Sequence, residues 1–249
     1  ADIILPASAF PEKTGTFTNT DRRVQMGRKA VNPPGEAKQD WWIIQELGKR
    51  LGLDWNYRGP DEIYDELRNC MDSIKNISWE RLVKEGAVTY PCDGEDKPGN
   101  EVIFGEGFPT KSKKGKLVPA NLISPDEVPD KKYPLVLTTG RLLEHWHTGS
   151  MTMRSKVLNH IEPEPYVHIS RSDMKNYNFE QNELVALKTR RGKVQVKVRF
   201  DKMIPEGMVF MPFCFENAPV NVLTNQALDP DGKIPELKYC AAKIEKISA

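Results

Sequence analysis

The chain has 249 residues and a formal net charge of +1, because 36 lysine and arginine residues nearly balance 35 acidic ones. A chain of this length can bury one sizeable core or two modest ones. A charge this close to zero argues against a dedicated polyanion-binding protein, so we expect no nucleic acid among its partners. No apolar run approaches the roughly 18 residues of a membrane-spanning helix. With no signal-peptide pattern at Ala1, the expected location is the cytoplasm.

The first region, residues 1–52, is predicted to be the tail of an α/β layer. Ile3–Leu5 is typical of a short strand. Asp40 is expected to cap a helix, and Gly52 is expected to end it. The apolar residues of this helix recur at helical spacing: Ile43, Ile44, Leu47 and Leu51.

The second region, residues 53–132, is predicted to be a connector, because its hydrophobic periodicity is weak. Pro60 opens a short amphipathic segment, whose apolar face consists of Ile63, Leu67, Cys70 and Met71. Farther on, a basic run lies among Ser and Gly residues: Lys111, Lys113, Lys114 and Lys116. This composition favours a solvated loop over a nucleic-acid contact.

The third region, residues 133–249, is predicted to be a β domain. Lys193–Phe200 alternates polar and apolar residues, as does a strand with one buried face. Arg190–Gly192 is predicted to turn between this strand and Leu184–Leu187. Further short strands are expected at Leu135–Leu137, Val209–Met211 and Ala242–Ile244. Several short strands separated by polar turns suggest a small closed barrel.

A polar loop, Gly140–Thr152, follows the first of these strands and reads GRLLEHWHTGSMT. Arg141 offers a planar fork to a phosphate, the glycines allow backbone N–H groups to approach closely, and the hydroxyls add donors. This is the composition of an anion-binding loop. Judged by spacing alone, a surface loop rich in turn formers explains it at least as well.

Four segments, in the same order, resemble the bis-molybdopterin guanine dinucleotide oxidoreductases. This family includes formate dehydrogenases, periplasmic nitrate reductases and dimethyl sulfoxide reductase. Gly140–Thr152 is similar to the pterin-binding loop of the family's C-terminal domain. Glu12–Gln25 resembles its EKxGTFTNTxRRVQ signature, and Pro33–Trp41 resembles its PPGEAxxDW segment. Asn221–Thr224 and Pro235–Ala241 resemble its closing NxLT and PExKxCA segments.

Within that family, Ile77–Leu82 and Tyr90–Cys92 look most like the catalytic subunit of cytosolic, NAD-linked formate dehydrogenases. The resemblance implies a double-psi β-barrel as the dinucleotide-binding domain in the third region. Because the family's catalytic subunits are much longer, it also implies that the chain is a C-terminal portion.

The cofactor implied by the resemblance is bis-molybdopterin guanine dinucleotide with molybdenum or tungsten, shared with an N-terminal portion of the same subunit. Iron–sulfur clusters are expected only in other parts of the enzyme. Asn221 suits the mixed donor and acceptor edge of a pterin, and Lys238 suits a phosphate or pterin oxygen. Without the resemblance, these two would be a turn former and a surface lysine. Carried over to the matching positions, the cofactor contacts are Gly140, Arg141, Glu144, His145, Trp146, His147, Thr148, Gly149, Ser150, Met151, Thr152, Phe215, Asn221 and Lys238.

Neither the histidines nor the cysteines predict a metal centre. His145 and His147 form an H-x-H pair, but two histidines make an incomplete site. The cysteines form no C-x-x-C pair and are expected to be buried small hydrophobes: Cys70, Cys92, Cys214 and Cys240. No metal ligand and no catalytic residue is predicted, so the chain alone should not turn over.

The leading hypothesis is a cofactor-holding portion of a molybdenum- or tungsten-dependent formate dehydrogenase. Formate would be the substrate, and its electrons would pass through iron–sulfur and flavin partner subunits to NAD. One alternative keeps the family and changes the reaction to nitrate reduction. Another is a non-catalytic scaffold of the same fold, although the retained loop at 140–152 argues against it.

Overall fold

A computed structural model describes residues 1–247, and the chain divides into two compact units, Ala1–Val118 and Pro119–Ala249. The last two residues of the predicted β domain lie outside the described part. Helices and strands occur in both units, which confirms the mixed α/β class. Among residues 1–247, no helix has the length and apolar character needed to cross a membrane.

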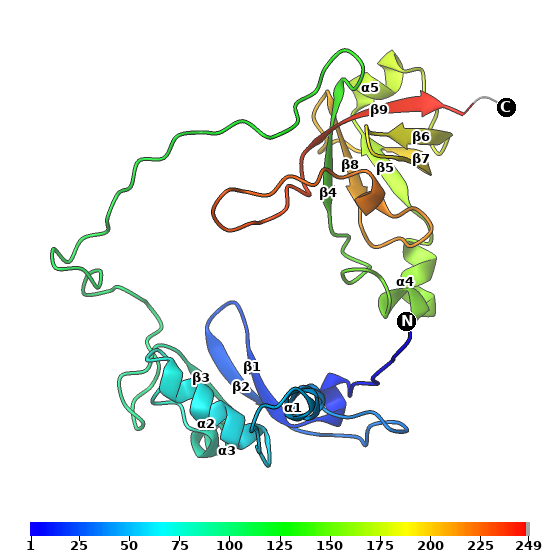
Figure 1. Cartoon of the computed structure of the whole chain (residues 1–249). Helices are drawn as coiled ribbons and strands as arrows, with labels where there is room; N and C mark the ends of the chain where they lie inside the picture. The colour runs from blue at the N-terminus through cyan, green and yellow to red at the C-terminus, as the bar shows by residue number, and fades with distance from the viewer. Residues whose placement is uncertain (248–249) are drawn as a thin grey trace. The chain divides into compact units, whose positions relative to one another are not determined.

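The first unit contains a three-stranded antiparallel sheet in the order β1-β2-β3 (Figure 1). Its strands are β1 (Gly15–Thr18), β2 (Arg23–Gly27) and β3 (Ala87–Thr89). Val24 and Met26, two positions apart on β2, are both buried, and Val88 of β3 joins them in the core. This spacing is the period of a strand with one face on a core.

The helices of this unit are the 3-10 helix η1 (Phe10–Glu12) and the α-helices α1 (Asp40–Arg50), α2 (Pro60–Cys70) and α3 (Trp79–Glu85). Two of them, α2 and α3, complete its core. Ser78 caps α3, since its Oγ accepts a hydrogen bond from the backbone N of Arg81 at 3.1 Å. α2 and α3 contribute Tyr64 and Leu82 to the same core, and the Tyr64 hydroxyl donates to the carbonyl of Ile77 at 3.0 Å.

Two expectations for the N-terminal region are wrong. Ile3–Leu5 forms no strand and is exposed, with 80% of Ile4 accessible. α1 forms where predicted, but Gln39 rather than Asp40 occupies the N-cap position. The Asp40 carboxylate instead pairs with Lys13, and this hydrogen bond lowers the pKa of Asp40.

The apolar face predicted for α1 is not its buried face in this unit. Ile44, Leu47 and Leu51 are exposed, and the buried residues of the helix are Gln45 and Gly48. The periodicity located the helix correctly, but this unit covers a different side of it.

The region predicted as a connector, residues 53–132, is folded in its first part. α2, α3 and β3 all pack into the core of the first unit, which extends to Cys92. From residue 93 to 132 the chain has no helix or strand. Cys70, expected to be buried, is exposed on α2, whereas the other three cysteines are buried.

The second unit is a closed barrel with the strand order β4-β8-β5-β7-β6-β9 (Figure 1). The β4·β8 and β5·β7 pairs are parallel, and the other neighbours are antiparallel. This mixed barrel confirms the predicted β domain and agrees with a double-psi barrel. Its strands are β4 (Leu135–Gly140), β5 (Tyr166–Ile169), β6 (Leu184–Lys188), β7 (Lys193–Phe200), β8 (Met208–Pro212) and β9 (Cys240–Lys246).

One apolar cluster fills the barrel. Every strand contributes at least one fully buried side chain, among them Leu137, Ile169 and Met211. Burial of a side chain of this size contributes roughly 1.5–3 kcal/mol. The connections carry short helices: η2 (Thr152–Arg154), α4 (Lys156–Ile161), α5 (Arg171–Asn176) and η3 (Val220–Val222).

Candidate functional site

The predicted loop leaves the barrel at the end of β4. Gly140 lies against the ring of Phe210 on β8, and a Cβ at this position would approach Phe210 Cε2 to 2.6 Å. Glycine therefore allows β4 and β8 to remain paired to their ends, where Gly140 lies opposite Pro212.

The loop is held by its own hydrogen bonds. Thr152 Oγ1 accepts from the backbone N of Trp146 at 3.0 Å. The backbone N of Gly149 donates to the carbonyl of Trp146, and that of Met153 donates to the carbonyl of Gly149, both at 2.9 Å. Contacts within the chain thus define a conformation for the loop.

His145 supports this loop from inside. Its side chain is buried, and Nε2 lies 2.7 Å from the carbonyl of Glu162. Nδ1 lies 3.3 Å from Thr152 Oγ1, and the ring meets Phe215 edge-on at 5.6 Å. Both ring nitrogens therefore have partners within the chain.

Gly149 occupies a position that other residues would strain. Its φ is +74°, and a Cβ would lie 2.7 Å from the carbonyl oxygen of Cys214 and 2.8 Å from Met153 Cε. Both the backbone conformation and the close approach require glycine. The loop therefore lies directly against the chain that follows β8.

A pocket of about 520 Å³ opens where these two segments meet. Thr148 and Ser150 bring hydroxyls to it, and Arg154 brings a guanidinium group. Such donors suit phosphate oxygens and the polar edge of a heterocycle. Its lining residues are Thr148, Gly149, Ser150, Met153, Arg154, Phe213, Cys214, Phe215, Glu216 and Pro219.

The outer part of the loop is accessible. Arg141, Trp146, His147 and Met151 are exposed, and Glu144 is half-buried. The guanidinium of Arg141 lies 5.7 Å from the ring centre of Phe213, and the His147 ring meets the same phenylalanine edge-on at 5.3 Å. Phe213, which also lines the pocket, therefore lies beside two residues that are predicted to contact the cofactor.

Asn221 and Lys238 come from two other segments of the barrel unit. Asn221 lies in η3 and Lys238 lies two residues before β9, and both side chains are exposed. Neither belongs to the pocket lining, but Pro219, just before η3, does. The structure therefore brings η3 close to the pocket and leaves Lys238 outside it.

The pocket lining also includes one cysteine. Burial raises the pKa of the Cys214 thiol to about 11, so the group stays protonated near neutral pH. Among residues 1–247, no three His, Cys, Asp or Glu side chains gather as a possible metal site.

Several pocket residues are not among those predicted from the sequence: Met153, Arg154, Phe213, Cys214, Glu216 and Pro219. Phe213 and Phe215, on both sides of Cys214 and directly after Pro212, are the feature of the sequence that could have indicated this side of the pocket. Arg154 gave no signal of its own.

Arg22, within the Glu12–Gln25 segment that resembles the family signature, has a structural role. The Arg22 guanidinium donates to the carbonyls of Tyr90, Asn100 and Glu101, at 3.0 Å for Asn100 and 2.7 Å for Glu101. This residue ties the β1–β2 hairpin to the chain after β3.

Two family descriptions match the chain. Residues 135–241 match the Molydopterin dinucleotide binding domain, and residues 1–50 match the Molybdopterin oxidoreductase family. The chain belongs to the molybdopterin oxidoreductase family. Its closed barrel is the dinucleotide-binding domain of that family, and β4 to β9 cover nearly the same residues as the first match.

Relatives of known name cover the whole chain. It is 46% identical over 249 residues to the F420-dependent formate dehydrogenase subunit alpha of Methanocaldococcus jannaschii. It is 39% identical to F420-dependent formate dehydrogenase 1 subunit alpha of Methanococcus maripaludis, and 38% to the assimilatory nitrate reductase catalytic subunit of Bacillus subtilis. These matches cover 98–99% of the chain but only 36–37% of each relative. The chain thus spans little more than a third of their length.

Among solved structures, acetylene hydratase from Pelobacter acetylenicus is similar, with a TM-score of 0.73 and 21% identity. The match covers 99% of this chain and 38% of the hydratase chain. At this identity the comparison supports the fold alone.

The pocket fits the cofactor that this family implies. A molybdopterin dinucleotide combines a diphosphate with a polar heterocycle, so it needs several fixed donors. Thr148, Ser150 and Arg154, which line the pocket, carry such donors. Only one carboxylate, that of Glu216, lines the pocket.

Proposed function

We propose that the chain is the cofactor-binding C-terminal portion of a formate dehydrogenase alpha subunit, whose intact form oxidises formate to CO₂. The observation that carries this proposal is the 46% identity with the Methanocaldococcus jannaschii alpha subunit over 99% of the chain. The chain by itself is not expected to turn over, because the family's metal ligand and iron–sulfur cysteines have no match in its sequence.

In this proposal the barrel holds the bis-molybdopterin guanine dinucleotide, with molybdenum or tungsten, together with the N-terminal portion of the subunit. Arg141 and the hydroxyls of Thr148 and Ser150 donate to the diphosphate and the pterin edge. Asn221 and Lys238 add donors from the two segments before β9, and Phe215 backs the loop. When bound, the metal supplies two-electron redox chemistry. The protein's own part is to fix donors and exclude water.

We propose further that the electrons leave through iron–sulfur and flavin subunits in the cytoplasm. The resemblance found in the sequence favours NAD as the final acceptor. The formate dehydrogenase relatives from the two methanogens are instead named as F420-dependent. Both acceptors therefore belong in the test.

Nitrate reduction is the second candidate, because the Bacillus subtilis nitrate reductase is 38% identical over 98% of the chain. The intact protein, purified without oxygen, should reduce a viologen dye with formate. Reconstituted with its partner subunits, it should then reduce F420 or NAD. Nitrate-dependent oxidation of the reduced dye, with no activity toward formate, would overturn the proposal in favour of the second candidate.

A further inference from the structure

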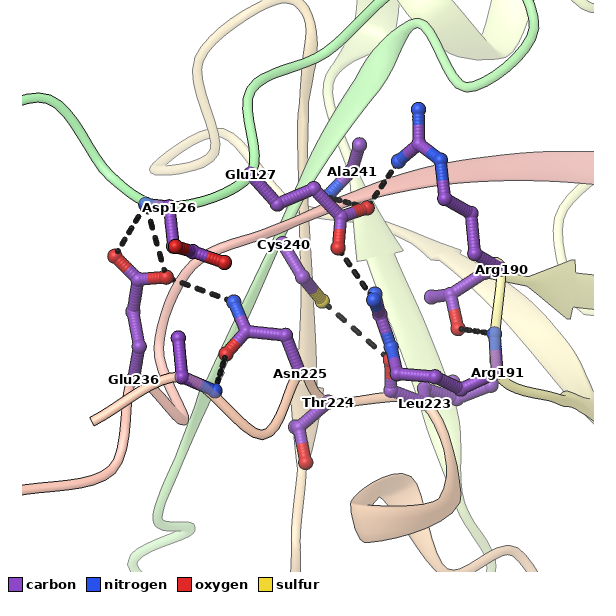
Figure 2. Close-up of polar contacts among 12 residues, drawn as sticks. Asp126, Glu127, Arg190, Arg191, Leu223, Thr224, Asn225, Glu236, Cys240 and Ala241 are labelled. Carbon is purple, nitrogen blue, oxygen red and sulfur yellow. Dashed lines mark hydrogen bonds and ion pairs between the residues drawn. The ribbon is translucent and has the colours of Figure 1, made fainter.

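A polar network fixes the two segments that carry Asn221 and Lys238, and most of its members lie outside the pocket and the predicted contacts (Figure 2). Its centre is Glu127, on the chain before β4. The Glu127 carboxylate accepts from the guanidinium groups of Arg190 and Arg191, at the turn between β6 and β7. It also accepts from the backbone N of Ala241, in β9, at 3.2 Å.

Arg191 extends the network toward Asn221, whereas Arg190 extends it away. Arg191 Nε donates to the carbonyl of Leu223 at 3.0 Å, directly after η3. Arg190 donates instead to the carboxylate of Asp130 at 2.6 Å, on the chain that leads into the barrel. Two neighbouring arginines thus share one carboxylate but hold different segments.

Asn225 joins the η3 segment to the segment of Lys238. Its Nδ2 donates to the Glu236 carboxylate at 2.7 Å and to the carbonyl of Tyr239 at 3.2 Å. Its Oδ1 accepts from the backbone N of Ala227 at 3.0 Å. Asn225 is buried, so removing its amide would leave unpaired groups in the interior of the unit.

Two more hydrogen bonds complete this network, which forms a frame for the segments that carry Asn221 and Lys238. Thr224 Oγ1 donates to the carbonyl of Asn221 itself at 3.2 Å. Thr139, at the end of β4, donates to the carbonyl of Leu237 at 2.8 Å. Lys238 is therefore flanked by Leu237, bound to β4, and by Tyr239, bound to Asn225. The start of the β4 loop, η3 and the Lys238 segment share one hydrogen-bonded frame.

We propose that Arg191 and Asn225 are positioning residues, which hold Asn221 and Lys238 at a fixed separation so that both reach one bound pterin dinucleotide. This inference rests on the proposed function. A flexible loop would lose conformational freedom each time it closed on the cofactor, and a frame fixed beforehand avoids that loss. The residues act through Asn221 and Lys238 and need not touch the cofactor.

The test compares Arg191→Ala with Arg190→Ala in the intact, cofactor-loaded protein, because each variant removes one arginine from Glu127. To measure the rate of cofactor release, samples are taken over time and the pterin that is still bound to the protein is extracted by oxidation. Its fluorescence then gives the amount of cofactor that remains. Arg191→Ala should speed release at least about tenfold, and Arg190→Ala by less than about twofold. Asn225→Leu, which keeps the size of the side chain without its hydrogen bonds and adds no charge beside Glu236, should behave as Arg191→Ala does.

A merely structural role is distinguished by adding Arg191→Ala to a variant that carries both Asn221→Ala and Lys238→Ala. If Arg191 acts through these two residues, the triple variant releases pterin no faster than the Asn221→Ala/Lys238→Ala variant. Additive effects, or equal effects of the two arginine variants, would overturn the inference. If Arg191→Ala yields no folded protein, Asn225→Leu in the same cycle decides. Wild-type protein without pterin would instead refute the proposed function itself.

Discussion

At the scale of single residues, two positions of the site require glycine, which has no Cβ atom. Gly140 and Gly149 allow the loop and its neighbours to approach within distances that a Cβ would prevent. His145, the most chemically suggestive residue of the loop, is occupied by Glu162 and Thr152. The exposed side chains, Arg141 above all, are the ones left to meet a ligand.

Replacing Gly149 by alanine should destabilise the barrel more than the same change at Gly207. Both residues have positive φ, +74° and +78°, but nothing lies within 4 Å of the Cβ position at Gly207. Gly207→Ala should therefore lower the free energy of unfolding by about 1–2 kcal/mol, from the backbone alone. Gly149→Ala adds the clash with Cys214, so its cost should be clearly larger. Urea unfolding measures both, and equal losses would show that the close approach at Gly149 is not maintained.

At the scale of elements, local pattern predicted five of the six barrel strands, because each of the five contains a short apolar run or an alternation of polar and apolar residues. The pocket was partly predictable. Its polar loop at 140–152 was predicted, and the aromatic residues on both sides of Cys214 could have indicated the side opposite the loop. The β5 strand was not predicted. The network around Glu127 was not predicted either, since it joins residues that are distant in the chain. In α1 the apolar period located the helix but not its buried side, because burial depends on what packs there.

In the first unit, Arg22 should control the order of the chain after β3. Arg22→Ala removes donors to three carbonyls, and charged hydrogen bonds contribute about 1.5–3 kcal/mol each. The amide of Asn100, bonded to the carbonyl of Pro91, should then exchange at least about tenfold faster.

The neighbouring Arg23→Ala is the matched control, because it removes the same charge from an exposed position of β2. It should leave the exchange of Asn100 unchanged. Equal acceleration by both variants would mean that charge, and not the three hydrogen bonds, orders this segment.

At the scale of the whole chain, two compact units each have their own apolar core. The second carries the family's dinucleotide-binding barrel, and three of its segments present the residues that we assign to the cofactor. The polar frame centred on Glu127 connects two of these segments, and the hydrogen bond from Thr139 to the carbonyl of Leu237 connects the third.

A structure of the intact protein purified with its cofactor tests this account most directly. It should show a pterin dinucleotide with its diphosphate or pterin edge within hydrogen-bond distance of Arg141, Thr148 or Ser150. Asn221 and Lys238 should both contact the same molecule. A fully occupied cofactor bound elsewhere, with these side chains in solvent, would contradict the account.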